Sequence, residues 1–223
     1  AIILLIGCLL SPVQLLTQYL FSAHMAVHVV LLLIVAPLLV IAMPDKLPPM
    51  VYRLFHFIAE HPLFSWFAGV GIMWLWHVPV IFNSMGQHQH VLIHYIETAS
   101  LVTAGIIFSY PVINANRRLP ILNSIVYLFS ACVFCSLLGL MITFAPLGVY
   151  YHYLSATDTY HINGLIRNQW QISQTDDQQA AGLIMWVPCC MIYLSAVIYL
   201  LKQWFDEKDY KDTLKMFTKR SKL

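Results

Sequence analysis

Residues 22–44 read SAHMAVHVVLLLIVAPLLVIAMP. The stretch is long enough to cross a bilayer as one helix, which takes about 20 apolar residues. It opens with His24 and His28, and their four-residue spacing puts both on one face of a helix. Ionisable side chains inside a membrane are costly and usually mark functional sites. The pair therefore suggests a site just inside the end of a membrane helix.

The rest of the chain shares this apolar character. Of its 223 residues, 60% are hydrophobic and only 10% are charged, whereas soluble domains carry about 25% charged residues. The composition indicates a membrane protein. Residue 1 lies inside an apolar run without an initiator methionine, so we expect one or more helices to precede it.

Apolar stretches of helix length recur along the chain, separated by turn-like breaks rich in proline, glycine and asparagine. They predict an all-α fold, a polytopic membrane helical bundle with six visible spans, of which the first is partial. The full protein would have seven spans if one precedes residue 1. The bundle is predicted over 1–204, with an outer loop at 147–179, and a basic cytoplasmic tail over 205–223. The spans are expected at 1–12, 22–43, 63–84, 90–113, 120–146 and 180–204.

The basic residues predict the orientation. Eleven of the twelve lie on one side of the predicted bundle, and only Arg167 lies on the other. Cytoplasmic loops are enriched in lysine and arginine, so the first side and the C-terminus are predicted to be cytoplasmic. The basic tail is then an anchor near anionic lipid.

The histidines concentrate on the opposite side. Eight of the ten lie on or near the outer side of the predicted bundle. At about 1.5 Å of rise per residue, His28, His77 and His94 lie roughly 6–10 Å below the outer ends of three different helices. His88, His90, His152 and His161 are expected to be solvated loop residues.

Imidazoles at one depth in three helices predict a metal site. His24, His28, His77 and His94 are its candidate ligands, with thioethers from Met25 and Met185. Imidazole with thioether suits copper, especially Cu(I), and imidazole with carboxylate suits zinc or iron as well. Further candidates are Glu97, three residues after His94, and Asp177, near the start of the last span. Other roles are open for each residue: hydrogen-bonded histidines, a carboxylate paired only with His94, and Asp177 as a helix cap.

Other motifs favour no further chemistry. The cysteines fall inside apolar spans, where cysteine commonly acts as a small hydrophobic residue, although Cys132 and Cys135 have the spacing of a redox or metal motif. Several tryptophan and tyrosine residues, Tyr150 and Tyr153 among them, are expected in an interfacial belt. No nucleotide-binding or hydrolase motif is present, and the basic residues are too scattered for a nucleic-acid surface.

Four stretches in order resemble the CtaG family of multi-spanning cytochrome c oxidase assembly factors. They are HMAVHVVLLLIVAPLLVIAMP at 24–44, MWLWHVP at 73–79, HYIETASLVTAGIIFSYPVI at 94–113 and DDQQAAGLIMWVP at 176–188. The chain departs from the family pattern at Ala181, in place of a glycine, and at Thr98, where many relatives have a histidine.

The resemblance implies a non-enzymatic assembly factor in the bacterial plasma (inner) membrane. Such a protein would bind copper and deliver it at the outer leaflet to haem-copper oxidase subunits, receiving it from a copper donor protein. The family residues carried over onto this sequence are His24, Met25, His28, His77, His94, Glu97, Asp177, Gln178 and Met185.

Two other functions remain open. Histidines of two helices could ligate haem b in a membrane cytochrome, although His24 and His28 on one helix face suit a small ion better. The chain could also be a metal-free scaffold for oxidase assembly. A copper permease is less favoured, since only Cys132 and Cys135 offer ligands toward the cytoplasmic side.

Overall fold

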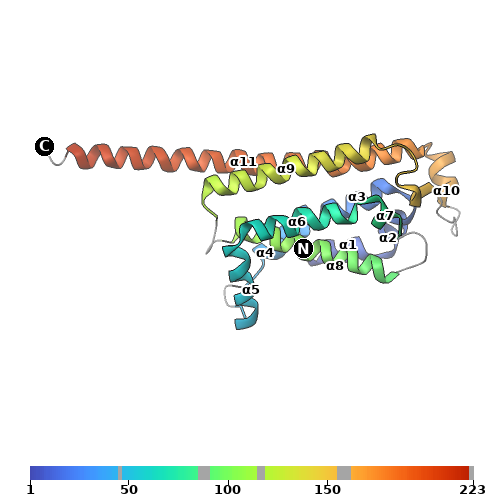
Figure 1. Cartoon of the computed structure of the whole chain (residues 1–223), viewed down its shortest axis with the longest axis horizontal. Helices are drawn as coiled ribbons and strands as arrows, with labels where there is room; N and C mark the ends of the chain where they lie inside the picture. The colour runs from blue at the N-terminus through green and yellow to red at the C-terminus, as the bar shows by residue number, and fades with distance from the viewer. Residues whose placement is uncertain (45–46, 85–90, 115–118, 155–161, 221–223) are drawn as a thin grey trace.

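The computed structural model describes residues 1–44, 47–84, 91–114, 119–154 and 162–220, and every regular element in these ranges is helical (Figure 1). The all-α prediction is confirmed. The loop histidines His88, His90 and His161 and the basic residues Lys46, Arg117, Arg118 and Lys222 lie outside the described residues, and the side chain of His152 is not described.

The six predicted spans are only partly recovered. Among the described residues, four helices are long and apolar enough to cross a membrane: 21–41, 93–113, 121–144 and 174–208. The bent pair α1 (Ile2–Leu9) and α2 (Ser11–Tyr19), which meet at 54°, makes a fifth if it counts as one span. The predicted first span ended at residue 12, but Pro12 stands in the first turn of α2, where proline is tolerated.

The span predicted over 63–84 is broken in the structure. Helix α6 (Pro62–Trp76) is followed by the short α7 (Pro79–Ser84). A proline lacks a backbone N–H and disfavours helical geometry in the residue before it, so Pro79 ends the first helix. His77 therefore stands at the end of α6, as its C-cap residue.

The opening stretch of the sequence forms the central span. It comprises α3 (Phe21–Val30), η1 (Leu31–Val35) and α4 (Ala36–Ile41), which run on as one helix. The widened π-helical turn η1 lies directly before Pro37, whose ring cannot fit the ordinary turn preceding it. The span packs against α8 (Val91–Ile113) and α11 (Gln174–Arg220).

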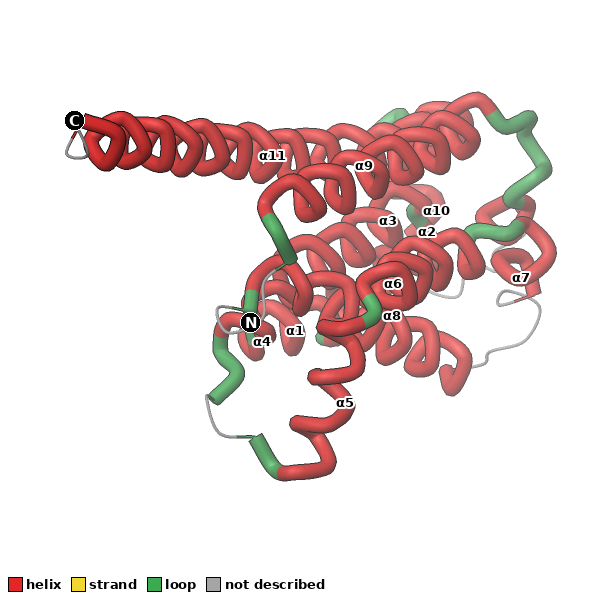
Figure 2. Tube along the Cα trace, turned by 60° about the vertical axis from the view of Figure 1, so that its left-hand side comes forward, coloured by secondary structure: helices red, strands yellow, loops and turns green. Residues whose placement is uncertain are grey.

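The last two long helices pack side by side. Helix α9 (Ile121–Phe144) lies along α11 (Figures 1 and 2). Two small residues permit the close approach: a Cβ atom on Gly182 would lie 2.6 Å from the carbonyl oxygen of Gly139. Small residues at contacts of this kind let membrane helices pack backbone to backbone.

Helix α11 is longer than predicted at both ends. It begins at Gln174 because Ser173 and Asp176 form a capping box: the Asp176 backbone N–H donates to Ser173 Oγ at 3.1 Å, and the Ser173 backbone N–H donates to Asp176 Oδ2 at 3.3 Å. At the other end it runs unbroken to Arg220. The predicted boundary between bundle and tail at 204–205 therefore falls within one helix.

The two ends of the bundle differ. Helix α5 (Pro49–Glu60) and the C-terminus lie at one end, and α7 and α10 (Ile162–Gly164) lie at the other (Figure 1). Arg53 belongs to α5, while Arg167 lies in η3 (Leu165–Gln169), which follows α10. The described basic residues thus divide between the ends as the sequence predicts, and the orientation toward the cytoplasm stays a prediction.

Candidate metal centre

Two imidazoles on the first helix of the central span begin the candidate centre. His24 and His28 are both buried, and their ring centroids lie 4.2 Å apart. The spacing of one helical turn brings them to the same face of α3, which is directed into the bundle. Neither ring is left to contact lipid.

A carboxylate from another helix lies against both rings. Glu97 on α8 is 0% exposed, and its Oε1 atom lies 3.3 Å from the Nε2 atoms of both His24 and His28. Its other oxygen, Oε2, lies 3.1 Å from Nδ1 of His94. The carboxylate therefore contacts three imidazoles, one of which, His94, is partly exposed.

The donor atoms fit a metal ion. One nitrogen each from His24 and His28 and an oxygen of Glu97 lie within 4.8 Å of one another. In the described part of the chain, His24 Nε2 and Glu97 Oε1, which lie 3.3 Å apart, are buried without a hydrogen bond, and so is Nδ1, the His28 ring nitrogen that does not contact Glu97. Buried polar atoms without a hydrogen bond cost free energy. Two ligand atoms that each lie about 2.0 Å from one ion, at a near-tetrahedral angle, are roughly 3.3 Å from each other. Glu97 Oε1 lies 3.3 Å from Nε2 of His24 and from Nε2 of His28.

A second pair adjoins this group. The ring centroid of His77 lies 5.5 Å from that of His28, and His77 Nε2 lies 3.1 Å from the Met25 sulfur. His77 Nδ1 lies 2.6 Å from the carbonyl oxygen of Met73. That contact assigns the proton to Nδ1 and leaves Nε2 as the lone-pair nitrogen, on the side of Met25. We call His24, His28, His77, His94, Glu97 and Met25 the histidine cluster.

Two other predicted ligands lie outside the cluster. Met185 on α11 is buried in the adjoining pocket. Asp177 has a different partner: its oxygens accept the backbone N–H groups of Phe21 at 2.9 Å and Ser22 at 3.0 Å, and the Ser22 hydroxyl at 2.6 Å. It caps the N-terminus of α3, whose first N–H groups lack partners within the helix. The sequence suggests that Asp177 caps its own helix, and the structure instead pairs it with a helix 155 residues away.

The next residue along α11 holds a third helix. The side-chain amide of Gln178, carried over from the family pattern, donates to the carbonyl oxygens of Ile142 and Ala145 at 3.1 and 2.7 Å. These are among the carbonyls at the end of α9 that lack partners within the helix. Asp177 and Gln178 thus fix the first turn of α11 to the start of α3 and the end of α9.

Loss of the Asp177 contacts should loosen the start of α3. We expect Asp177→Ala to lower the free energy of unfolding by about 1–3 kcal/mol, because loss of the charged acceptor leaves two helix N–H groups unpaired. Thermal unfolding of the purified chain in detergent measures this. Asp176→Ala, which removes only the exposed cap of α11, should cost less. Equal losses for the two variants would contradict the assignment.

Buried aromatic side chains pack beside the cluster. Tyr150 and Tyr153, expected in an interfacial belt, are buried. The ring of Phe21 lies 5.1 Å from that of Tyr153 and 5.0 Å from that of Phe82, and Phe82 lies edge-on to His24 at 5.7 Å. These rings pack against His24 and one another on one side of the cluster. Only the density of tyrosines in the loop hinted at this packing.

Comparison with known proteins decides the family. The family model described as cytochrome c oxidase caa3 assembly factor (Caa3_CtaG) matches residues 1–207. The chain belongs to that family. The resemblance drawn from the four sequence stretches is thereby confirmed. No curated protein and no solved structure matches the chain.

Family membership assigns a role in cytochrome c oxidase assembly, carried out by a chain with several membrane-type helices. Each of the four stretches that carry the Caa3_CtaG resemblance supplies residues to the cluster or to its frame. The first supplies His24, Met25 and His28, and the next two supply His77, His94 and Glu97. The last supplies Asp177 and Gln178, which fix α3 and α9 around the cluster.

Proposed function

We propose that this chain binds copper in the histidine cluster and delivers it to a haem-copper oxidase during assembly. The observation that carries the proposal is a buried carboxylate in contact with three imidazoles from two helices. An assembly role follows from the family, and copper is one of the metals that a haem-copper oxidase must acquire. The chain would act as a carrier and not as an enzyme.

Charge and ligand type favour Cu(I) within the cluster. A single carboxylate, Glu97, balances a single positive charge, and a buried site with no net charge avoids the cost of an unpaired ion. Neutral imidazoles and the Met25 thioether are ligands that suit Cu(I). His94, whose side chain is 29% exposed, offers a way for the ion to enter or leave. We place the donor and the oxidase on the outer side, where the predicted orientation puts the cluster.

A haem b site is the rival from another class. Axial ligands must face each other across the porphyrin, but the rings of His24 and His28 are neighbours on one helix, with centroids 4.2 Å apart. A Soret band in the absorbance spectrum of the purified chain would favour the cytochrome. The proposal predicts none.

Metal analysis tests the copper proposal. The wild-type chain, purified in detergent and loaded with Cu(I), should retain copper through desalting, and His24→Ala/His28→Ala should lose the copper held in the cluster. His56→Ala/His61→Ala is the matched control, because these histidines belong to α5 and the residue after it, at the other end of the bundle. Equal copper in all three proteins would contradict the proposal. If no copper binds, and the histidine variant still supports oxidase assembly, the metal-free scaffold is favoured.

Copper binding should depend on pH. A metal ligand must be a neutral imidazole, so protons compete with the ion. Histidine has an ordinary pKa of about 6.5, and burial disfavours the charged ring, so binding is expected to be full at and above this pH and to weaken only at lower pH. Titration with a chelator whose own copper affinity is known at each pH measures the effect. Affinity that rises as the pH falls would contradict ligation by histidine.

A further inference from the structure

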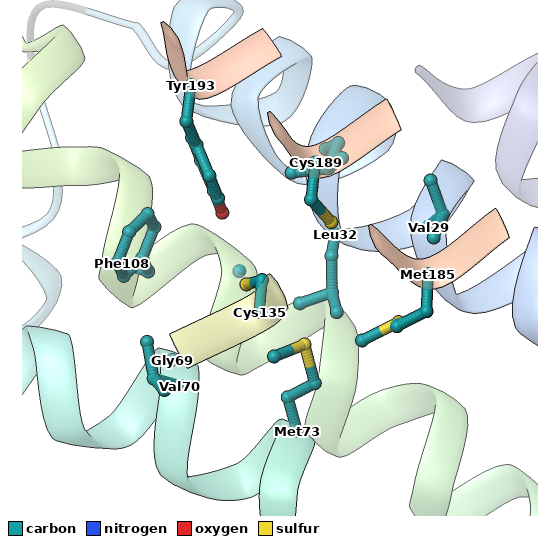
Figure 3. Close-up of a pocket in the computed structure, with 12 residues that line it drawn as sticks. Val29, Leu32, Gly69, Val70, Met73, Phe108, Cys135, Met185, Cys189 and Tyr193 are labelled. Carbon is teal, nitrogen blue, oxygen red and sulfur yellow. The ribbon is translucent and has the colours of Figure 1, made fainter. Parts of the chain in front are cut away.

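A pocket rich in sulfur (Figure 3) adjoins the histidine cluster, because its lining includes Val29, next to His28, and Met73, whose carbonyl oxygen contacts His77. It encloses about 400 Å³ between the central span and α6, α8, α9 and α11, counting its opening. Four sulfur-bearing side chains line it: Met73, Cys135, Met185 and Cys189. All four are buried, and no residue in the lining is charged.

The pocket and the cluster share their walls. Met73, whose side chain faces the pocket, provides the carbonyl oxygen bonded to His77, and Val29 of the lining directly follows His28. Met73 precedes His77 by four residues, so it lies roughly 6 Å deeper along α6. An ion released from the cluster would have soft ligands one helical turn away.

The thiols come from two helices that line the same pocket. Cys135 on α9 and Cys189 on α11 belong to one buried cluster and both line the pocket, and the sulfur of Cys189 points into it, as does that of Met73 (Figure 3). A second thiol pair lies nearby. Cys132 is about one helical turn from Cys135 on α9, Cys190 directly follows Cys189 on α11, and the two sulfurs lie 3.4 Å apart. The contact between Gly139 and Gly182 that brings α9 and α11 together therefore also brings the thiols together.

The lining chemistry selects a soft monovalent cation. Thiolate and thioether sulfur favour Cu(I), while the lining residues include no carboxylate or imidazole for Mg²⁺, Ca²⁺ or Fe²⁺. If one thiol loses its proton to solvent on binding, its negative charge balances Cu(I). The other sulfurs can then bind as neutral donors. A divalent ion would need both thiols to lose their protons, and placing two thiolates together in an apolar pocket is costly.

We propose that Cys135 and Cys189, with the Met73 thioether, form a second Cu(I) site. This site is separate from the histidine cluster and rests on its own residues. It would hold a second ion or receive one from the cluster, with the release of one proton per ion bound. Cys135 and Cys189 would then be metal ligands in addition to small buried residues.

The test is a Cu(I) titration of the full chain in detergent under anaerobic conditions, against a chromogenic Cu(I) chelator. The wild type should bind two equivalents and gain the ultraviolet absorption of thiolate-to-copper charge transfer. Cys135→Ser/Cys189→Ser should bind one equivalent without that absorption. His24→Ala/His28→Ala should also bind one, but with the absorption retained, so each site can fail independently of the other.

Cys8→Ser is the matched control, because Cys8 lies on α1 outside the pocket, and it should bind two equivalents. The inference is overturned if the Cys135/Cys189 variant still binds two equivalents. If that variant does not fold, the other two proteins test the inference. Wild-type chain that is saturated with Cu(I) but lacks the charge-transfer absorption would overturn it. The same absorption in His24→Ala/His28→Ala, which lacks the histidine ligands, would support it.

Discussion

Replacing Glu97 with glutamine is expected to lower the affinity of the cluster for Cu(I) by about 10–100-fold, the range seen when a ligand or its immediate support is lost at a metal site. Glutamine has nearly the same shape but no charge. It would leave the positive ion unbalanced in a buried site and weaken the contacts to His24, His28 and His94. Competition with a Cu(I) chelator measures the affinity.

Glu60→Gln is the control for Glu97→Gln. Glu60 also contacts an imidazole, with Oε2 3.1 Å from His56 Nδ1, but it is exposed on α5. We expect its replacement to leave Cu(I) affinity unchanged, because exposed pairs contribute little. The same two variants can be compared for oxidase activity in membranes, where only Glu97→Gln should reduce activity. Unchanged Cu(I) affinity in Glu97→Gln would contradict a role of the carboxylate in metal binding and leave it only a structural role.

Replacing Gly182 with alanine is expected to lower the free energy of unfolding by about 1–3 kcal/mol, the range found when extra atoms are inserted into a well-packed core. The added Cβ would lie 2.6 Å from the carbonyl oxygen of Gly139 and 2.7 Å from the backbone nitrogen of Thr143. Both atoms belong to the α9 backbone, so the helices must move apart. The movement would also separate Cys135 from Cys189, and the variant should therefore lose charge-transfer absorption with Cu(I).

Gly71→Ala is the matched control for Gly182→Ala. Nothing lies within 4 Å of a Cβ added at Gly71, which is within α6, and alanine favours a helix over glycine by up to about 1 kcal/mol. Thermal unfolding in detergent should therefore show a lower midpoint for Gly182→Ala and an equal or higher one for Gly71→Ala. Equal midpoints in Gly182→Ala and wild type would show that α9 and α11 can separate freely.

Much of the helical framework could be predicted from local patterns. Apolar runs of about 20 residues located the long helices, because a span must satisfy its own backbone hydrogen bonds. The apolar runs did not predict helix ends that depend on a single residue. Pro79 divides a run that appears continuous in hydropathy, and the cap at Ser173 starts α11 six residues before the predicted apolar boundary.

The candidate site was also predictable in part from the predicted helices. Counting residues from the helix ends placed three imidazoles at one depth, and the structure brings His28, His77 and His94 into one cluster with Glu97. The partner of Asp177 was not predictable, because its contact with Ser22 joins residues 155 apart. The packing of Tyr150 and Tyr153 beside the cluster likewise depends on how the loop folds back over α3 and α7.

The thiol pocket shows the limit of reading motifs one at a time. Cys132 and Cys135 lie on α9, and their own spacing says nothing of Cys189 and Cys190 on α11. The pairs form only when the helices pack in one register. A single sequence contains no information on that register beyond the small residues Gly139 and Gly182.

X-ray absorption at the copper edge tests the central claim most directly. The Cys135→Ser/Cys189→Ser chain, loaded with one equivalent of Cu(I), leaves only the histidine cluster to hold the ion. The account predicts nitrogen or oxygen neighbours at about 2.0 Å, with the outer-shell scattering of imidazole, and loss of that signal in the same chain carrying His24→Ala/His28→Ala. Copper surrounded only by sulfur, or no bound copper, would contradict it.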